Sequence, residues 1–92
     1  KLEEGMVLSN EPGYYKKGFY GIRIENLVYV KKNKKKLQFE NLTLAPIEKG
    51  LISYNLLNNK EKEYLFNYHS NVYAKYSKLL NEKERKWLAS HI

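Results

Sequence analysis

The chain has 92 residues, a net charge of +7 and no cysteine. A chain of this length forms one domain at most and would bury roughly 60–65% of its unfolded surface. Without cysteine it has neither a disulfide framework nor a thiolate metal site. No apolar run reaches the ~20 residues of a membrane-spanning helix, so we expect a cytoplasmic protein with no membrane partner.

Lysine supplies almost all of the positive charge, since Arg23 and Arg85 are the only arginines. Contacts with bases and phosphates favour the planar guanidinium of arginine. The basic run at residues 31–36 also lacks the interleaved aromatic side chains on which bases stack. We therefore interpret the lysines as a solvated surface and expect no nucleic-acid partner. A small nucleic-acid-binding domain is one alternative, which a salt-dependent shift with DNA or RNA would support.

The first five residues contain no initiator methionine, and the only methionine, Met6, lies within the first strand pattern. We interpret the sequence as a C-terminal piece of a longer protein. An open reading frame that begins at Lys1 or Met6 would contradict this interpretation.

Residues 6–11 alternate as a strand does, with Val7, Ser9 and Glu11 on one face. Pro12 restricts Glu11 to extended geometry and excludes a helix at this point. Residues 13–18 contain two glycines and are expected to turn the chain. Glu11 is therefore expected at the end of a strand, just before a turn.

Residues 20–31 form the strongest strand pattern of the sequence. Alternation places Ile22 and Ile24 on one face and Arg23 and Glu25 on the other. Arg23 and Glu25 then project in the same direction, about 6.6 Å apart along the strand. The lysines at residues 31–36 follow as the tip of a hairpin.

The last part of the chain changes from strand to helix. Residues 37–47 are expected to form a third strand that ends near Pro46. Residues 58–61 and 81–84 each begin with asparagine and end with glutamate, which predicts the capping boxes of two helices. The first helix carries an apolar stripe at Leu65, Tyr68, Val72, Tyr76 and Leu79, and the second carries Trp87, Leu88 and Ile92. The predicted class is α+β, with antiparallel strands followed by a helical tail.

Two glutamates lie where strands are usually apolar, and charged side chains are seldom buried without a partner. Rigid strands can hold carboxylates at metal distance, and hard divalent ions prefer oxygen ligands. Two carboxylates aimed at one place repel unless a proton or a cation lies between them. From the residues alone a second interpretation stays open, in which Glu25 pairs with Arg23 and Glu11 caps a turn.

Residues 5–15, Gly-Met-Val-Leu-Ser-Asn-Glu-Pro-Gly-Tyr-Tyr, and residues 21–26, Gly-Ile-Arg-Ile-Glu-Asn, resemble the last part of the Xaa-Pro aminopeptidases. These are the aminopeptidase P-type members of the pita-bread metallopeptidase family M24. Residues 42–47 are similar to the strand that follows in that family, and residues 56–88 to its helical tail. The resemblance implies the C-terminal part of a pita-bread fold, with catalytic-domain strands in residues 1–55 and a helical extension in residues 56–92.

The resemblance also implies an activity, the removal of an N-terminal residue that precedes proline. In that family two aspartates, one histidine and two glutamates hold two divalent ions, usually manganese, that activate water. The match implies that Glu11 and Glu25 are two of these five ligands and that Glu11 also transfers a proton. It implies further that Arg23 orients the ligands and that Tyr15 lines the substrate pocket, although a packed aromatic is an equal alternative for Tyr15.

Three of the five ligands are missing, because the chain has no aspartate and its histidines lie in the tail. We expect His69 to be a partly buried helix residue and His91 an exposed one. The piece alone is expected to be inactive, with its site completed by the rest of the parent catalytic domain. The expected substrate is a peptide with proline in second position.

The aromatic tail leaves two alternatives open, packing onto the parent catalytic domain or association as a homodimer. The main alternative function is a pita-bread domain that has lost catalysis and binds other proteins. The two glutamates argue against that alternative, since a binding module has little need of them.

Overall fold

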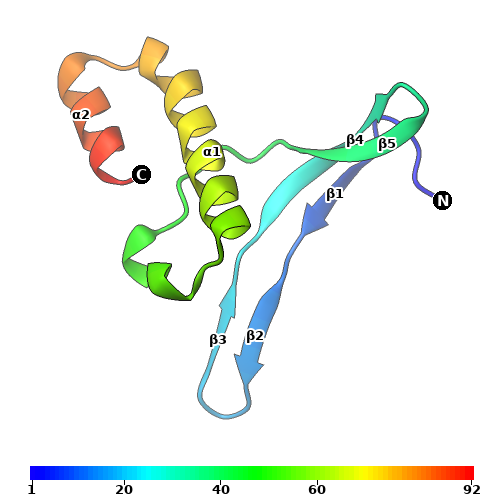
Figure 1. The fold of residues 1–92 in the computed structure, drawn as a ribbon, viewed down its shortest axis with the longest axis horizontal. Coiled ribbons are helices and arrows are strands. Elements are labelled where there is room, and N and C mark those ends of the chain that lie inside the picture. Colours follow the sequence, from blue (N-terminus) through cyan, green and yellow to red (C-terminus); the bar gives the residue numbers. More distant parts are fainter. The chain divides into compact units, whose positions relative to one another are not determined.

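The computed structural model describes residues 1–92 and divides into two compact units, Lys1–Thr43 (unit 1) and Leu44–Ile92 (unit 2). Unit 1 contains the strands β1 (Val7–Asn10), β2 (Gly13–Lys16), β3 (Tyr20–Arg23), β4 (Asn26–Asn33) and β5 (Lys36–Asn41) (Figure 1). Unit 2 contains the helices α1 (Asn59–Tyr76) and α2 (Glu82–Ser90) and the short 3-10 helices η1 (Lys49–Leu51), η2 (Tyr54–Leu56) and η3 (Ser77–Leu79). Antiparallel strands followed by a helical tail are thus confirmed.

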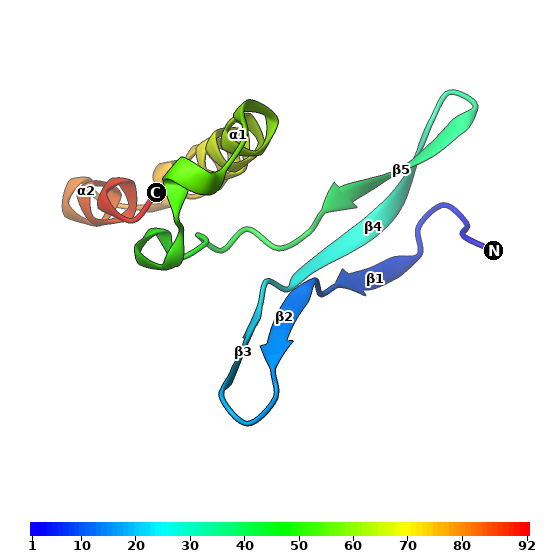
Figure 2. The same ribbon diagram turned by 60° about the horizontal axis from the view of Figure 1, so that its bottom comes forward.

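The strands of unit 1 form two antiparallel sheets, one with the order β1-β4-β5 and one of β2 and β3 alone. Along the chain, β2 continues from β1 and β3 leads into β4 (Figure 2). The four strands therefore make one long two-stranded ribbon, to which β5 adds a third strand at the β4 end.

The ribbon is interrupted at Pro12, which explains why the predicted strand boundaries are wrong here. The Ile24 N–H donates to the Pro12 carbonyl at 3.0 Å, but proline has no N–H with which to return a bond. The predicted strand 20–31 is consequently split into β3 and β4. Residues 13–16 were predicted as part of a turn and are instead the strand β2, and the turn is a single tight one in which the Phe19 N–H donates to the Lys16 carbonyl.

The predicted third strand ends earlier than residue 47. The Leu42 N–H donates to the Leu27 carbonyl, and the Leu27 N–H donates to the Thr43 hydroxyl, both at 2.8 Å. The Thr43 side chain thus takes the place of a backbone partner, and strand pairing stops after Asn41. The expected hairpin between β4 and β5 is present, but its turn is shorter than the predicted residues 31–36, since residues 31–33 and 36 pair as strands. The turn itself is residues 34–35, where Lys34 has a positive φ of 55°.

Both helices of unit 2 begin at the predicted capping boxes. Asn58 accepts from the Glu61 N–H while Glu61 accepts from the Asn58 N–H, and Asn81 and Glu84 repeat the arrangement. The core of unit 2 is formed by apolar residues of both helices and the segment before them: Tyr68, Val72 and Leu88, with Leu44, Ile47, Tyr73 and Leu80 packed against them.

The predicted apolar stripe of α1 is buried in the middle of the helix and exposed at its C-terminal end. Tyr68 and Val72 are buried, whereas Tyr76 and Leu79 are exposed. The helix ends at Tyr76, so Leu79 no longer follows the helical period. Neither helix is apolar and long enough to traverse a bilayer.

Candidate metal centre

The two glutamates singled out by the sequence lie between two strand ladders that share one register. The β1–β4 ladder ends at the pair Asn10 and Asn26, and the β2–β3 ladder begins at the pair Gly13 and Arg23. Three steps forward from Asn10 and three steps back from Asn26 lead to Gly13 and Arg23. The ribbon therefore keeps its register across the interruption, without an extra residue on either side.

This register places Glu11 directly opposite Glu25, and Pro12 opposite Ile24. The bond from the Ile24 N–H to the Pro12 carbonyl marks that pair as a hydrogen-bonded position. Hydrogen-bonded and non-hydrogen-bonded pairs alternate along antiparallel strands. Glu11 and Glu25 therefore form a non-hydrogen-bonded pair, in which the Cα atoms are about 4.5 Å apart and the side chains are closest. The structure thus brings together the two glutamates that the sequence could only place on separate strands.

Arg23 lies on the same face as this carboxylate pair and contacts one member of it. Its Nε atom lies 3.4 Å from Oε2 of Glu25, and both side chains are about half exposed. Glu11 has no ion pair in the structure. One guanidinium therefore faces two carboxylates, and like charges directly opposite each other destabilise a strand pair. The ribbon carries negative charge here that its own residues leave partly uncompensated.

Tyr15 lies on this face as well, one pair beyond Arg23. It stands opposite Gly21, and its ring extends over Gly13, whose missing side chain would otherwise collide with it. Tyr15 is 65% exposed within this chain. The four residues proposed for the site from the sequence, Glu11, Tyr15, Arg23 and Glu25, thus share one face of the ribbon.

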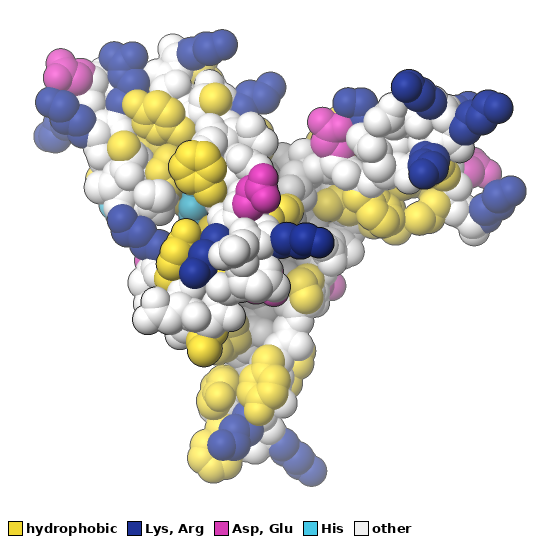
Figure 3. All heavy atoms as spheres, viewed as in Figure 1, with side chains coloured by type: hydrophobic (Ala, Val, Ile, Leu, Met, Phe, Trp, Pro, Cys, Tyr) yellow, Lys and Arg dark blue, Asp and Glu magenta, His cyan; other side chains and the backbone are white.

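The opposite face of the same ribbon is apolar. Tyr14 and Tyr20 lie there with ring centroids 6.2 Å apart, and Ile22 is 60% exposed. Hydrophobic side chains cover much of the β2–β3 hairpin in the lower part of Figure 3. The ribbon is therefore two-sided, with Arg23 and the two glutamates on one side and exposed apolar side chains, next to Lys16, on the other.

The donor set fits a divalent cation, because two carboxylates offer four oxygen ligands from rigid backbone positions. It does not complete a metal centre, since nowhere do three or more His, Asp, Glu or Cys side chains gather in a metal-binding arrangement. The residues of this chain can hold one side of a metal site and require further ligands from elsewhere.

The histidines are absent from this site, as the sequence indicated. His69 is 8% exposed in unit 2, where its Nε2 atom accepts from the Ile47 N–H at 3.0 Å. Burial lowers the pKa of His69 below its ordinary value. His91 is exposed and its Nδ1 atom lies 2.8 Å from the Trp87 carbonyl. His69 thus has a packing role in the tail, as predicted.

Two features of the structure were not found from the sequence. One is the pair of glycines beneath Tyr15, which a glycine within a strand pattern could have signalled. The other is a cavity of about 620 Å³ in unit 2, formed beside His69 by residues of three separate segments, among them Lys49, Tyr54 and Phe66. Since no single periodic pattern contains these segments, the sequence carried no signal for the cavity.

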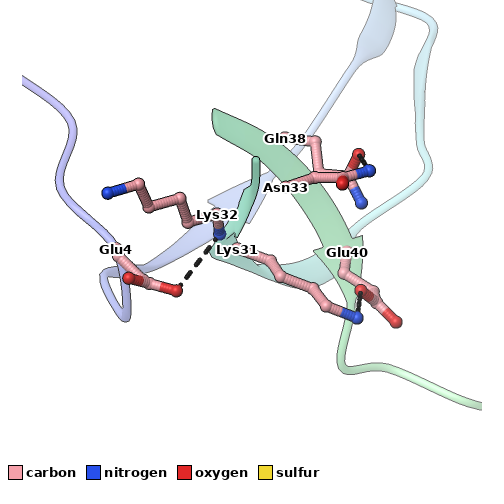
Figure 4. Close-up of polar contacts among 6 residues, drawn as sticks. All are labelled: Glu4, Lys31, Lys32, Asn33, Gln38 and Glu40. Atoms are coloured by element: carbon pink, nitrogen blue, oxygen red, sulfur yellow. Dashed lines mark hydrogen bonds and ion pairs between the residues drawn. The ribbon is translucent and has the colours of Figure 1, made fainter. Parts of the chain in front are cut away.

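The lysine-rich hairpin between β4 and β5 is held by contacts with acidic and polar side chains (Figure 4). Lys31 forms an ion pair with Glu40 at 2.9 Å, and the Lys32 N–H donates to Glu4. The ion pair raises the pKa of Lys31 and lowers that of Glu40.

Two family models match the chain almost end to end. Residues 1–32 match the model of metallopeptidase family M24, and residues 35–92 match that of the C-terminal region of peptidase M24.

The similar proteins agree with these matches. A Coprinopsis cinerea protein named "Probable Xaa-Pro aminopeptidase P" is 45% identical over 95% of this chain, and Aminopeptidase P2 of Arabidopsis thaliana is 40% identical over 95%. Among solved structures, the X-prolyl aminopeptidase of Caenorhabditis elegans, described as a cytosolic enzyme with a dinuclear active site, superposes with a TM-score of 0.82 at 36% identity over 98% of this chain. The chain spans only 16%, 14% and 16% of these three proteins, respectively.

Proposed function

Because this chain belongs to metallopeptidase family M24, we propose that it is the C-terminal part of a longer Xaa-Pro aminopeptidase. That enzyme removes an N-terminal residue from peptides with proline in second position. The full-length protein is then a cytoplasmic hydrolase, as the description of the Caenorhabditis elegans structure as a cytosolic enzyme suggests.

The observation that carries this proposal is the carboxylate pair of Glu11 and Glu25. A binding module would gain nothing from two acids at a non-hydrogen-bonded position of one strand pair, where they repel each other. A metal site does need them there, because the short distance lets both carboxylates reach the same cations. The dinuclear active site of the Caenorhabditis elegans enzyme agrees with this assignment.

We assign a role to each residue of the charged face. Glu11 and Glu25 would hold two divalent ions, proposed to be Mn²⁺, and Glu25 would be a ligand of both. Such a pair of ions, when bound, supplies an activated water and polarises the scissile carbonyl. The Arg23 guanidinium, in contact with Glu25, holds that carboxylate in orientation. An oxygen of Glu11 takes the proton of the attacking water and passes it to the departing proline nitrogen. Tyr15 lines the substrate pocket.

The rest of the parent supplies what this chain lacks. Two aspartates and one histidine from outside the chain complete the ligand set, and the 92-residue chain alone is inactive. Residues 1–55 belong to the catalytic domain and residues 56–92 form its helical extension. The aromatic side chains of the extension, which include the exposed Tyr64, Phe66 and Trp87, pack on the parent domain or on a second copy of it.

The test is hydrolysis of an Xaa-Pro-Xaa peptide by the full-length protein, with and without added Mn²⁺. We expect cleavage before proline by the full-length protein, loss of that cleavage in the presence of a chelator, and none by residues 1–92 alone. A matched peptide with alanine in place of proline serves as the substrate control. A full-length protein that binds no metal and cleaves neither peptide would favour a non-catalytic binding module instead.

A further inference from the structure

Two glycines lie inside strands of the charged face rather than at turns. Gly13 begins β2 and Gly21 lies in the middle of β3. Glycine weakens a strand, because it costs conformational entropy and offers no side chain to pack. Neither residue has a positive φ, since among the glycines only Gly5 and Gly18 do. The backbone conformation therefore does not explain why these two positions are glycine. The explanation must lie in what fills the space above them.

That space is filled by the ring of Tyr15. A Cβ atom added at Gly21 would lie 2.5 Å from Cδ1 of Tyr15, and one added at Gly13 would lie 2.7 Å from its hydroxyl oxygen. Distances below 3.0 Å are essentially never seen for real Cβ atoms. The ring thus lies flat on the ribbon, with its proximal edge beside Gly21 and its hydroxyl over Gly13.

The Tyr15 ring points along the ribbon towards the two glutamates. The pairs on the charged face follow one another as Tyr15 with Gly21, Gly13 with Arg23, and then the two glutamates. The ring lies from the first pair towards the second, so its hydroxyl is directed towards the carboxylates. A tyrosine hydroxyl held there can donate a hydrogen bond to a carboxylate or to a bound peptide.

We propose that Gly13 and Gly21 are positioning residues, which leave a shallow trough in which the Tyr15 ring lies and which thereby aim its hydroxyl at the metal-binding carboxylates. The expected effect on catalysis rests on the proposed function. That the two glycines make room for the Tyr15 ring rests on the contacts alone. The cross-strand pair of an aromatic ring with a glycine also stabilises the ribbon, since the ring covers the exposed backbone.

A methyl group at Gly21 forces the ring to move. Ordinary van der Waals contact begins at 3.4 Å, so a distance of 2.5 Å requires a displacement of about 1 Å. A displacement of this size in a catalytic site can lower the rate about 100-fold. We therefore expect Gly21→Ala in the full-length enzyme to lower kcat/KM for an Xaa-Pro peptide about 100-fold.

The decisive experiment combines Gly21→Ala with two changes of Tyr15 and measures both kcat/KM with Mn²⁺ and the thermal unfolding midpoint of the metal-free protein. In a Tyr15→Ala background no ring is present to collide, so Gly21→Ala should change neither quantity appreciably. In a Tyr15→Phe background the ring remains without its hydroxyl. There Gly21→Ala should still lower the unfolding midpoint but should no longer lower kcat/KM.

Gly50→Ala is the matched control. A Cβ atom added there would lie 3.1 Å from an oxygen of the flexible Glu48 side chain, which can move aside. Gly50 belongs to unit 2 and is not part of the charged face. We expect the substitution to leave kcat/KM unchanged.

Two results would overturn the proposal. If Gly21→Ala lowers the unfolding midpoint equally with and without the Tyr15 ring, the glycine does not make room for that ring. If Gly21→Ala lowers kcat/KM equally in the wild-type and Tyr15→Phe backgrounds, Gly21 does not act by positioning the Tyr15 hydroxyl. A wild-type protein that cleaves no Xaa-Pro peptide would refute the proposed function instead, and the unfolding measurements would still decide the role of the glycines.

Discussion

The two units differ in whether their buried apolar side chains form a core, although both expose large apolar side chains. In unit 2 the helices and the preceding segment enclose a core around Val72, which is fully buried. In unit 1 Val28 and Val30 are the only buried apolar residues, while Phe19 and Phe39 are 78% and 57% exposed. Unit 2 thus has a small core contributed by both helices, whereas the two buried residues of unit 1 lie on a single strand, β4.

This difference indicates what each unit contributes. A two-stranded ribbon without cover is marginally stable in water, so the apolar face of the β2–β3 part of unit 1 needs further protein against it. The charged face of the same ribbon depends on backbone register, and the register is set by hydrogen bonds that unit 1 makes internally. Unit 1 therefore positions the carboxylate pair and relies on further protein to cover its apolar face, whereas unit 2 has a small core of its own but also exposes large side chains such as Leu56 and Phe66.

The largest effect expected concerns the chemistry of unit 1. In the full-length protein, Glu25→Gln keeps the shape of the side chain but removes its charge, and with it one of the proposed metal ligands. Activity on an Xaa-Pro peptide should fall about 1000-fold, corresponding to ~4 kcal/mol, and metal content measured by elemental analysis should fall with it. Glu40→Gln, at an ion pair on the same unit, is the matched control and should retain activity. Unchanged turnover in Glu25→Gln would refute its assignment as a ligand.

The next effect concerns the core of unit 2. Val72→Ala leaves a cavity in a fully buried site and should lower the stability of this unit by about 2 kcal/mol. Hydrogen exchange of the full-length protein, followed peptide by peptide, can locate the effect. Exchange should accelerate in α1 and α2 and stay unchanged in β1 to β4.

The control for this prediction is Leu79→Ala, at a side chain that is 79% exposed in this chain. It should change the stability measured by exchange by less than ~0.5 kcal/mol. If hydrogen exchange accelerates equally in both units after Val72→Ala, the core around Val72 does not stabilise unit 2 separately from unit 1.

The smallest effect expected is a pH dependence of unit 2. Burial lowers the pKa of His69 below the ordinary value of 6.5, so the unfolded chain binds a proton more readily than the folded one. Stability from the neutral ring is then fully present above about pH 6.5 and is lost as the pH falls towards the folded pKa. Protonation also removes the lone pair with which Nε2 accepts from the Ile47 N–H and creates a cation beside Lys49 and Lys62 in the cavity.

This is checked by the thermal midpoint of the full-length protein at about pH 7.5 and about pH 5.5. The drop on acidification should be smaller in His69→Gln than in the wild type, because glutamine does not titrate. An identical drop in both proteins would show that His69 does not couple stability to pH.

The sequence predicted local features well wherever a single residue decided them. Asn58 and Asn81 cap their helices because the capping box is a contact between residues three apart. Pro12 marked the interruption of the ribbon, although its consequence, the division of one predicted strand into β3 and β4, required the partner strand to be known. The exposure of Leu79 depended on where the helix ended, which the periodic pattern does not show.

The site shows the same limit. Alternation placed Arg23 and Glu25 on one face, and they do form an ion pair. The placement of Glu11 opposite Glu25 depends on cross-strand register, for which the separate strand patterns contain no information. Gly13 looked like a turn residue because glycine is common in turns, and only the ring lying across it and Gly21 shows another reason for their small size.

The most direct test of the carboxylate pair is a crystal structure of the full-length protein grown with Mn²⁺, with anomalous data collected at the manganese edge. We predict two anomalous peaks beside the ribbon, with the Glu25 carboxylate between them and Glu11 bound to one of them. Manganese bound elsewhere in the protein, with no peak within ligand distance of Glu11 and Glu25, would contradict the assignment of these two glutamates.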